Sequence, residues 1–291
     1  MSSPWHFGNT TVRNPMRIRD GLTVLKNPAL NGHLIGEEQE RLLAYELDKA
    51  GVIKLGETRY IDLMGRKWRS CFSQLGFITH KFTRDLSPGQ KDPVILEIVK
   101  DHPELGLTGQ PFQLTPNGLR MIAAESVREQ QECMLRALLA YEIPSVIEPK
   151  NGEASFKPFI FILQVLKKLS MLEHPKGLSR VEMGIVQSYR DHGQVDQAVR
   201  DVLQFRAERD AAEGRVAKRT VENRLLENLA QAAGVKRGSI KDYADVNFRY
   251  PRLTGLVSLQ GKRLVLNEKK LPVIDAILAG GPKLCGKENF R

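Results

Sequence analysis

Two clusters of basic, amide and hydroxyl side chains have the chemistry needed to contact DNA. Arginine, lysine, asparagine and glutamine hydrogen-bond to the edges of guanine and adenine, and the same residue types contact phosphates. The first cluster consists of Arg66, Lys67, Arg69, Ser73, Gln74 and Lys81. The second consists of Lys236, Arg237, Ser239, Lys241, Tyr243, Asn247, Arg249 and Arg252, and Asp245 in the same helix could accept a hydrogen bond from cytosine. The alternative interpretation is that both clusters are solvated helix surfaces, with Trp68 and Phe72 in the core beneath the first.

The composition favours a polyanionic partner. The 291 residues include 44 Lys and Arg against 34 Asp and Glu, which gives a net charge of +10 and a pI of about 9.5. Cys71, Cys133 and Cys285 are widely spaced, and His174 and His192 have no partner at metal-ligand spacing, so neither a disulfide framework nor a zinc site is expected. Without a long apolar run or a secretory h-region, the sequence predicts a cytoplasmic protein with no membrane partner.

The sequence predicts a mainly helical protein, with the two clusters on helices. Asn14-Pro15 is typical of a helix start, and further helices are expected in "EEQERLLAYELDKAGV", at about 60–75 and at 115–141. Residues 84–111 predict a long loop with at most a short helix at "DPVILEIVKD". Beyond a proline-rich connector, helices are expected at "FIFILQVLKKL", after a Ser179–Glu182 capping box, and in "VDQAVRDVLQFRAERDAAEG" and "RTVENRLLENLAQAAG".

Each half of the chain ends on a similar pattern of a helix, a glycine and two short strands. In the first half "GFITHKF" would pair with "PFQLTP", and in the second a hairpin is expected around Gln260-Gly261. Three helices and a two-stranded wing indicate a winged-helix module, a helix-turn-helix variant whose last helix enters the major groove. The fold class is therefore mainly α with small β wings, arranged as tandem winged-helix modules. The expected organisation is module 1 at 1–142, a connector at 143–157, module 2 at 158–280 and a tail or linker at 281–291.

Several blocks of the sequence, in the same order, resemble a known family. "WHFGNTTVRNPMRIRDGL" is similar to the opening signature of the AlwI-type restriction endonucleases, which are related to the BstNBI and PleI nicking and type IIS enzymes. "FIFILQVLKKL", "GQVDQAVRDVLQFRAER" and "RYPRLTGLVSLQGKRLVLNEKKLPVIDAIL" resemble the corresponding blocks of these groups. The resemblance covers about residues 5–280 and points to the family's N-terminal DNA-recognition region.

The resemblance implies sequence-specific recognition of double-stranded DNA by a monomer. Family members cut DNA at a fixed distance outside a short asymmetric site, using winged-helix subdomains for recognition and a magnesium-dependent PD-(D/E)xK nuclease domain towards the C-terminus. The AlwI group implies a five-base-pair site of the GGATC kind, whereas the BstNBI group implies GAGTC. We expect no cofactor in this chain and Mg²⁺ in a C-terminal nuclease domain or a second catalytic subunit, in a bacterial or archaeal cytoplasm.

The resemblance also gives the opening residues 5–19 a role, as an N-terminal arm on DNA. Trp5 and Phe7 are expected to pack against the core. The residues expected to reach phosphates or base edges are Asn9, Thr10, Thr11, Arg13, Asn14, Arg17 and Arg19. The alternative is that Trp5 and Phe7 anchor an otherwise solvated terminus.

Two other functions are compatible with the sequence. Glu148-Pro149-Lys150, with Asp101 as a distant partner, could supply the carboxylates and lysine of an intact magnesium-dependent nuclease. Pro149 and Pro144 disfavour the central strand that this geometry needs, so a connector is favoured there. The other alternative is a tandem winged-helix transcription regulator, which would normally dimerise on a palindrome.

Overall fold

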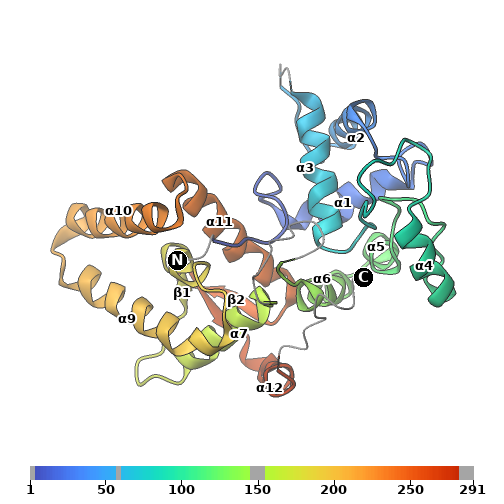
Figure 1. The fold of residues 1–291 in the computed structure, drawn as a ribbon. Coiled ribbons are helices and arrows are strands. Elements are labelled where there is room, and N and C mark those ends of the chain that lie inside the picture. The colour runs from blue at the N-terminus through green and yellow to red at the C-terminus, as the bar shows by residue number, and fades with distance from the viewer. Residues whose placement is uncertain (1–3, 57–59, 145–154, 282–291) are drawn as a thin grey trace. The chain divides into compact units, whose positions relative to one another are not determined.

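The computed structural model describes residues 4–56, 60–144 and 155–281, which form two compact units (Figure 1). The continuous stretch Thr11–Leu138 is one unit, which we call the inserted unit. The host unit combines the residues up to Thr10 with those from Leu139 onwards. Among the described residues, no helix combines the length and the apolar character that crossing a membrane requires.

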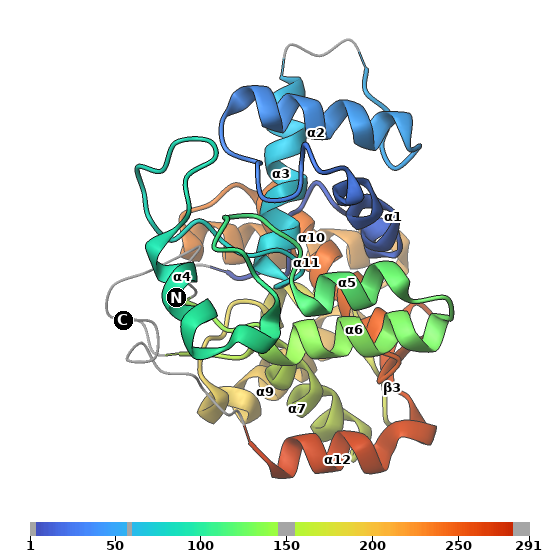
Figure 2. The same cartoon turned by 90° about the vertical axis from the view of Figure 1, so that its right-hand side faces the viewer.

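The inserted unit is built from short helices. α4 is the short helix expected within the long loop, and α5 and α6 lie side by side, where the Asn117 amide donates to the Cys133 carbonyl at 3.2 Å (Figure 2). In chain order the elements are η1 (Pro15–Arg17), α1 (Ile18–Thr23), η2 (Val24–Lys26), α2 (Glu37–Lys49), α3 (Ile61–Gln74), α4 (Pro93–Asp101), η3 (Pro103–Leu105), α5 (Pro116–Ala123) and α6 (Val127–Ala140).

A glycine allows α2 and α3 to pack closely. A Cβ atom on Gly65 would lie 1.8 Å from the carbonyl oxygen of Glu40, so a side chain at this position would collide with the backbone of α2. Trp68 and Phe72 are buried on the inner face of α3, as the alternative, solvated-surface interpretation of the first cluster expected. The outer face of α3 is left for polar residues.

The wing expected in the first half is reduced to a single bridge. Ile78 and Leu114 form an isolated antiparallel bridge, so the predicted pairing partners do meet, but no strand extends from them. The Thr79 hydroxyl accepts a hydrogen bond from the Gln113 N–H at 3.1 Å, and Pro111 has no N–H to donate. Side-chain bonding and proline therefore end the ladder after one step.

The host unit combines helices with a three-stranded antiparallel sheet of order β1-β3-β2. Leu178 of β1 lies opposite Leu264 of β3, and the β2–β3 turn has positive φ at Gly261 and Lys262, as in a type I′ hairpin. The expected hairpin is confirmed, but its two-residue turn is Gly261-Lys262, one residue later than the expected Gln260-Gly261. The elements are α7 (Pro158–Ser170), β1 (Leu178–Ser179), α8 (Arg180–Val186), η4 (His192–Gln194), α9 (Val195–Ala211), α10 (Gly214–Ala233), α11 (Arg237–Arg249), η5 (Tyr250–Thr254), β2 (Val257–Gln260), β3 (Arg263–Leu266), η6 (Glu268–Lys270) and α12 (Leu271–Ala279).

Local signals in the sequence set the helix boundaries of the host unit. The Ser179–Glu182 capping box begins α8 as expected. α9 and α10 form a helical hairpin, in which Arg209 and Glu222 make an ion pair at 2.7 Å (Figure 1). The candidate site is formed mainly by α8, α11 and the β2–β3 hairpin, and α9 and α10 contribute one residue each, Arg209 and Glu222.

The N-terminal segment is part of the host unit. Trp5 and Phe7 are buried, as expected, and the Trp5 indole N–H donates to the Tyr189 carbonyl at 2.7 Å. The Phe7 ring lies edge-on to Tyr141, with 5.6 Å between ring centroids. Residues 4–10 thus complete the core formed from residue 139 onwards, whereas the expected module 1 included them.

Candidate nucleic-acid interface

A basic groove of about 410 Å³ lies in the host unit beside the β2–β3 hairpin. It is bounded by the beginning of α8, the end of α11 and the hairpin with its turn, together with Arg209 of α9 and Glu222 of α10. Three acidic side chains, Glu182, Glu222 and Asp245, line this arginine groove together with six basic ones, Arg180, Arg209, Arg249, Arg252, Lys262 and Arg263. The excess of basic groups suits the groove to an anionic ligand.

Asp245 holds two of these arginines. Its carboxylate is 9% exposed, and Oδ1 accepts from Arg180 Nη1 at 3.2 Å while Oδ2 accepts from Arg249 Nε at 2.9 Å. Arg180 is the first residue of α8 and Arg249 the last of α11. One buried carboxylate therefore joins the ends of two helices, and the two guanidinium groups remain 64% and 42% exposed.

Glu182 is the most deeply buried anion of the groove. Its carboxylate accepts from Arg206 Nε at 3.0 Å, from Arg263 Nη1 at 2.8 Å and from the Ser179 N–H at 2.8 Å. Burial alone would raise the pKa of Glu182, but the hydrogen bond from Arg206 and the positive charges of Arg206 and Arg263 hold that pKa below its usual value. Glu182 is therefore ionised at neutral pH and fixes the position of Arg263.

The structure brings part of the second predicted cluster to the arginine groove. Arg249 and Arg252 line it. Lys236, Arg237 and Lys241 are exposed near the beginning of α11, where they add positive charge to the same helix. Arg249 ends α11 and Arg252 lies just beyond it in η5, so α11 has basic residues at or beside both ends.

Asn247 does not lie at the surface, contrary to the sequence prediction. The side chain is fully buried, with Oδ1 accepting from the Phe7 N–H at 3.0 Å and Nδ2 donating to Gln187 Oε1 at 3.0 Å. It therefore satisfies backbone and side-chain groups of the core and is not available to a base edge. Ser239 and Tyr243 are half-buried.

Arg69 is likewise engaged within the inserted unit. Its Nη1 donates to the Leu34 carbonyl at 2.7 Å and lies 2.5 Å from Glu40 Oε1, and the guanidinium carbon stands 4.5 Å from the centroid of the Phe112 ring. Burial lowers the pKa of Arg69, and the charge of Glu40 opposes this shift. The predicted DNA contact is thus corrected to a structural role, because the donor groups of Arg69 are directed into the protein.

The remaining members of the first cluster divide between surface and core. Ser73 is buried, and its Oγ lies 3.3 Å from Nδ1 of His80. Burial and the nearby charge of Arg69 lower the pKa of His80 to about 4, so this imidazole is neutral at neutral pH. Ser73 therefore also lies away from the position expected for a DNA contact. Arg66 and Lys67 are exposed on α3, while Gln74 and Lys81 are half-buried.

The predicted arm is divided between the two units. Asn9 and Thr10 belong to the host unit and are half-buried. The members in the inserted unit are the half-buried Thr11 and Arg19 and the exposed Arg13, Asn14 and Arg17. Asn14 caps η1 by accepting from the Met16 N–H at 3.2 Å, and Arg17 Nη1 donates to the Val52 carbonyl at 2.5 Å.

The described residues contain no group of three or more His, Cys, Asp and Glu side chains that could hold a metal ion. Asp101 is exposed at the end of α4, and Glu148 and Lys150 lie outside the described residues, as does Cys285. His192 is half-buried: its Nε2 accepts from the Lys157 N–H at 3.3 Å, so Nδ1 carries the proton and donates to a glutamine oxygen. This histidine has a structural role.

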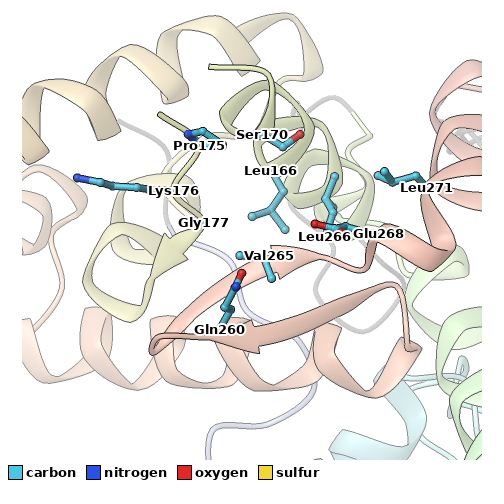
Figure 3. A pocket seen from close by; sticks show the side chains of 10 residues that line it. All are labelled: Leu166, Ser170, Pro175, Lys176, Gly177, Gln260, Val265, Leu266, Glu268 and Leu271. Atoms are coloured by element: carbon cyan, nitrogen blue, oxygen red, sulfur yellow. The ribbon is translucent and has the colours of Figure 1, made fainter. Parts of the chain in front are cut away.

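A second hollow of the host unit, of about 420 Å³, lies between α7 and the hairpin (Figure 3). Leu166, Val265 and Leu271 point into it, and its titratable lining residues are Lys176 and Glu268. A single lysine and a single glutamate in an otherwise mixed lining provide no pair of catalytic carboxylates and no cluster of basic groups. The arginine groove is the better candidate for a binding site.

Sequence reasoning missed four basic residues of the arginine groove. Arg180 directly follows the capping Ser179, Arg209 lies near the end of α9, Lys262 occupies the hairpin turn, and Arg263 begins β3. The predicted turn, Gln260-Gly261, stops one residue short of Lys262, so the hairpin signal did not include this residue. Arg180 had no comparable signal, because its partner Asp245 is 65 residues away in the sequence.

Comparison with protein-family models places the chain among the restriction endonucleases. Residues 73–285, which are more than half of the chain, match the model of the AlwI restriction endonuclease family, and the chain belongs to that family. The opening signature identified in the sequence lies before the matched residues. The search of curated proteins gave no match.

Proposed function

We propose that the chain is the sequence-specific DNA-recognition part of a type IIS restriction or nicking endonuclease. The observation that carries this proposal is the arginine groove, where basic side chains from α8, α11 and the hairpin converge. Phosphates and guanine edges are the acceptors that such groups bind. Membership of a restriction endonuclease family supports DNA as the ligand, and the net charge of +10 has the matching sign.

The proposal assigns the host unit a winged-helix role. In chain order, α7, β1, α8, α11, β2 and β3 give helix, strand, helix, helix and hairpin, and β1 pairs with β3 in the sheet. The α9–α10 hairpin is then an insertion before the third helix. In this arrangement α11 enters the major groove, and the hairpin with Lys262 at its turn meets the DNA backbone.

The inserted unit is proposed to contact phosphates through its exposed basic residues. Arg66 and Lys67 stand together on the outer face of α3, and Arg13 and Arg17 are exposed near η1. Two units of different structure on one duplex suit an asymmetric site read by a monomer. The proposed site has five base pairs and is of the GGATC kind.

Selection of random duplexes on the immobilised chain tests this function. We expect enrichment of one short asymmetric sequence, bound by a single chain in sedimentation analysis. A pool that stays random after several rounds would overturn sequence-specific recognition. A palindrome bound by two chains would instead favour the transcription regulator.

Incubation of the chain with plasmid DNA and magnesium separates recognition from cleavage. The proposal places the magnesium-dependent chemistry in a further domain or subunit, so we expect binding without nicks. Site-specific nicks that disappear when Glu148 is changed to Gln would establish the intact nuclease and remove the recognition-only function.

A further inference from the structure

We infer that Asp245 is a positioning residue for DNA sequence discrimination, because it sets the direction in which Arg180 and Arg249 present their guanidinium groups. The inference rests on the proposed function and names the residues that would read the base edges. It concerns the Asp245 triad, which we define as Asp245 with these two arginines. Asp245 itself would not touch DNA, since its side chain is 9% exposed.

The hydrogen bonds of the Asp245 triad leave a reading edge on each arginine. Arg249 donates to Asp245 through Nε, so its two terminal nitrogens remain directed away from the carboxylate. Arg180 donates through Nη1, which leaves the edge formed by Nε and Nη2. Among the described residues, neither guanidinium makes another hydrogen bond or ion pair. Each can therefore form the two parallel hydrogen bonds with which arginine recognises guanine O6 and N7.

The position of the triad favours base reading over simple attraction to phosphates. A phosphate contact needs positive charge and tolerates several side-chain directions, whereas a two-bond contact with guanine needs a fixed plane. Asp245 fixes the direction of both guanidinium groups by hydrogen bonds. It binds Arg180 across the contact between α11 and α8, and it binds Arg249 from one turn earlier in α11. It does so at an electrostatic cost, because a carboxylate in a basic groove weakens general attraction to DNA.

These two effects have opposite signs, and D245N separates them. The substitution removes the negative charge and one acceptor oxygen while keeping the size of the side chain. We expect the variant to bind the duplex recovered by selection at least about tenfold more weakly, as loss of an oriented guanine contact predicts. Binding to a duplex of the same composition in shuffled order should stay equal or become tighter, because the groove has gained positive charge.

Two further variants complete the experiment. E227Q is the matched control, because it removes one negative charge, as D245N does, from an exposed residue of α10 outside the groove. It should leave discrimination between the two duplexes unchanged. R249K keeps the positive charge but loses the planar fork, so it should reproduce the loss seen with D245N. The double variant should lose no more than either single variant, because both changes act through one contact.

Three outcomes would overturn the inference. If D245N tightens binding to both duplexes equally, Asp245 only weakens attraction to DNA. If D245N weakens both duplexes together and lowers the melting temperature, Asp245 is only structural. If R249K keeps full discrimination, the Arg249 fork does not read a base. In each of these cases the wild-type chain would still select a preferred duplex, so the proposed function would survive; a wild-type chain that selects none would end both.

Discussion

At the scale of single residues, Glu182 joins two roles that are usually separate. It accepts hydrogen bonds from the buried Arg206 and the half-buried Arg263, and it completes the capping box of α8 with Ser179. Removal of the carboxylate would leave two arginines without their shared anion in a region of low solvent exposure. Such an uncompensated charge is costly.

We predict that E182Q lowers the free energy of unfolding by about 3 kcal/mol, the usual cost of breaking a buried ion pair. Glutamine can still accept from the Ser179 N–H, so the variant tests the charge and preserves the cap. S179A is the matched control, because it removes the hydroxyl cap alone and should cost about 1 kcal/mol. Urea unfolding of both variants at neutral pH measures the difference. An E182Q protein as stable as the wild type would show that the ion network contributes nothing.

The contribution of ionised Glu182 should also appear in the pH dependence of stability. The folded pKa of Glu182 is held below its unfolded value of about 4.3, so its contribution is complete above that value and is lost as the pH falls through the folded pKa. We therefore expect the stability difference between wild type and E182Q to shrink as the pH is lowered from about 6 to about 3. Urea midpoints across this range measure it. A constant difference would contradict the assignment.

Residue types alone did not distinguish contact residues from core residues. Arg249 and Arg252 were predicted at a binding surface and do line the arginine groove, but Asn247, on the same helix, is buried. The partners of Asn247 include the Trp5 carbonyl, 242 positions away in the sequence. Arg69 was misassigned for the same reason, since its partners Leu34 and Glu40 come from another segment. Such long-range hydrogen bonds leave no periodic trace in a sequence.

At the scale of elements, the packing of α2 on α3 provides a sharp test. G65A should lower the free energy of unfolding by about 3 kcal/mol or abolish folding, because the added Cβ would press on the Glu40 carbonyl. G238A is the matched control: Gly238 also lies in a helix, but a Cβ there would meet nothing within 4 Å. That variant should be neutral or more stable by up to about 1 kcal/mol. Thermal unfolding compares them, and a G65A protein of wild-type stability would contradict the close helix contact.

The two predicted wings show which elements a sequence can specify. The β2–β3 hairpin formed with its turn one residue later than predicted, at Gly261 and Lys262, because such a turn needs only two residues with positive φ. The other pair had to join Ile78 to Leu114 across a long loop, and only one bridge remains. The residues of a short turn were therefore enough to predict a hairpin. The pairing of Ile78 with Leu114 depends on contacts between distant segments, which the local sequence does not show. The short strand β1 had no predicted counterpart.

At the scale of the whole molecule, the excess positive charge should appear as salt dependence. We predict that the affinity of the chain for a shuffled duplex falls as salt rises, and that replacing Arg66 and Lys67 together by alanine flattens the slope of log K against log salt by about 2. Alanine at the exposed Lys269 and Lys270 removes the same charge from η6 and is the matched control. Binding titrations at several salt concentrations measure both slopes. A slope for the Arg66 and Lys67 variant that equals the wild-type slope would exclude phosphate contacts by α3.

The arrangement of the chain into units was only partly predictable. The sequence indicated mainly helical structure, a small antiparallel sheet and a break near residue 143, and the division between units falls at Leu138 and Leu139. It did not indicate that residues 4–10 belong with the C-terminal part. Trp5 and Phe7 predicted burial but could not predict where, because an aromatic side chain carries no information on its partner.

Because residues up to Thr10 belong to the host unit, both ends of the inserted unit connect to the host unit. During synthesis all residues of the inserted unit leave the ribosome before Tyr141 and Tyr189 do. Trp5 and Phe7 can therefore reach their packing positions only after the inserted unit has been made. Truncation of the opening residues would consequently remove packing and hydrogen-bond partners of Tyr141, Tyr189 and Asn247. An exchange of the inserted unit between members of the family should therefore join the chains after Thr10 and before Leu139. Trp5 and Phe7 would then stay with the host unit and its arginine groove.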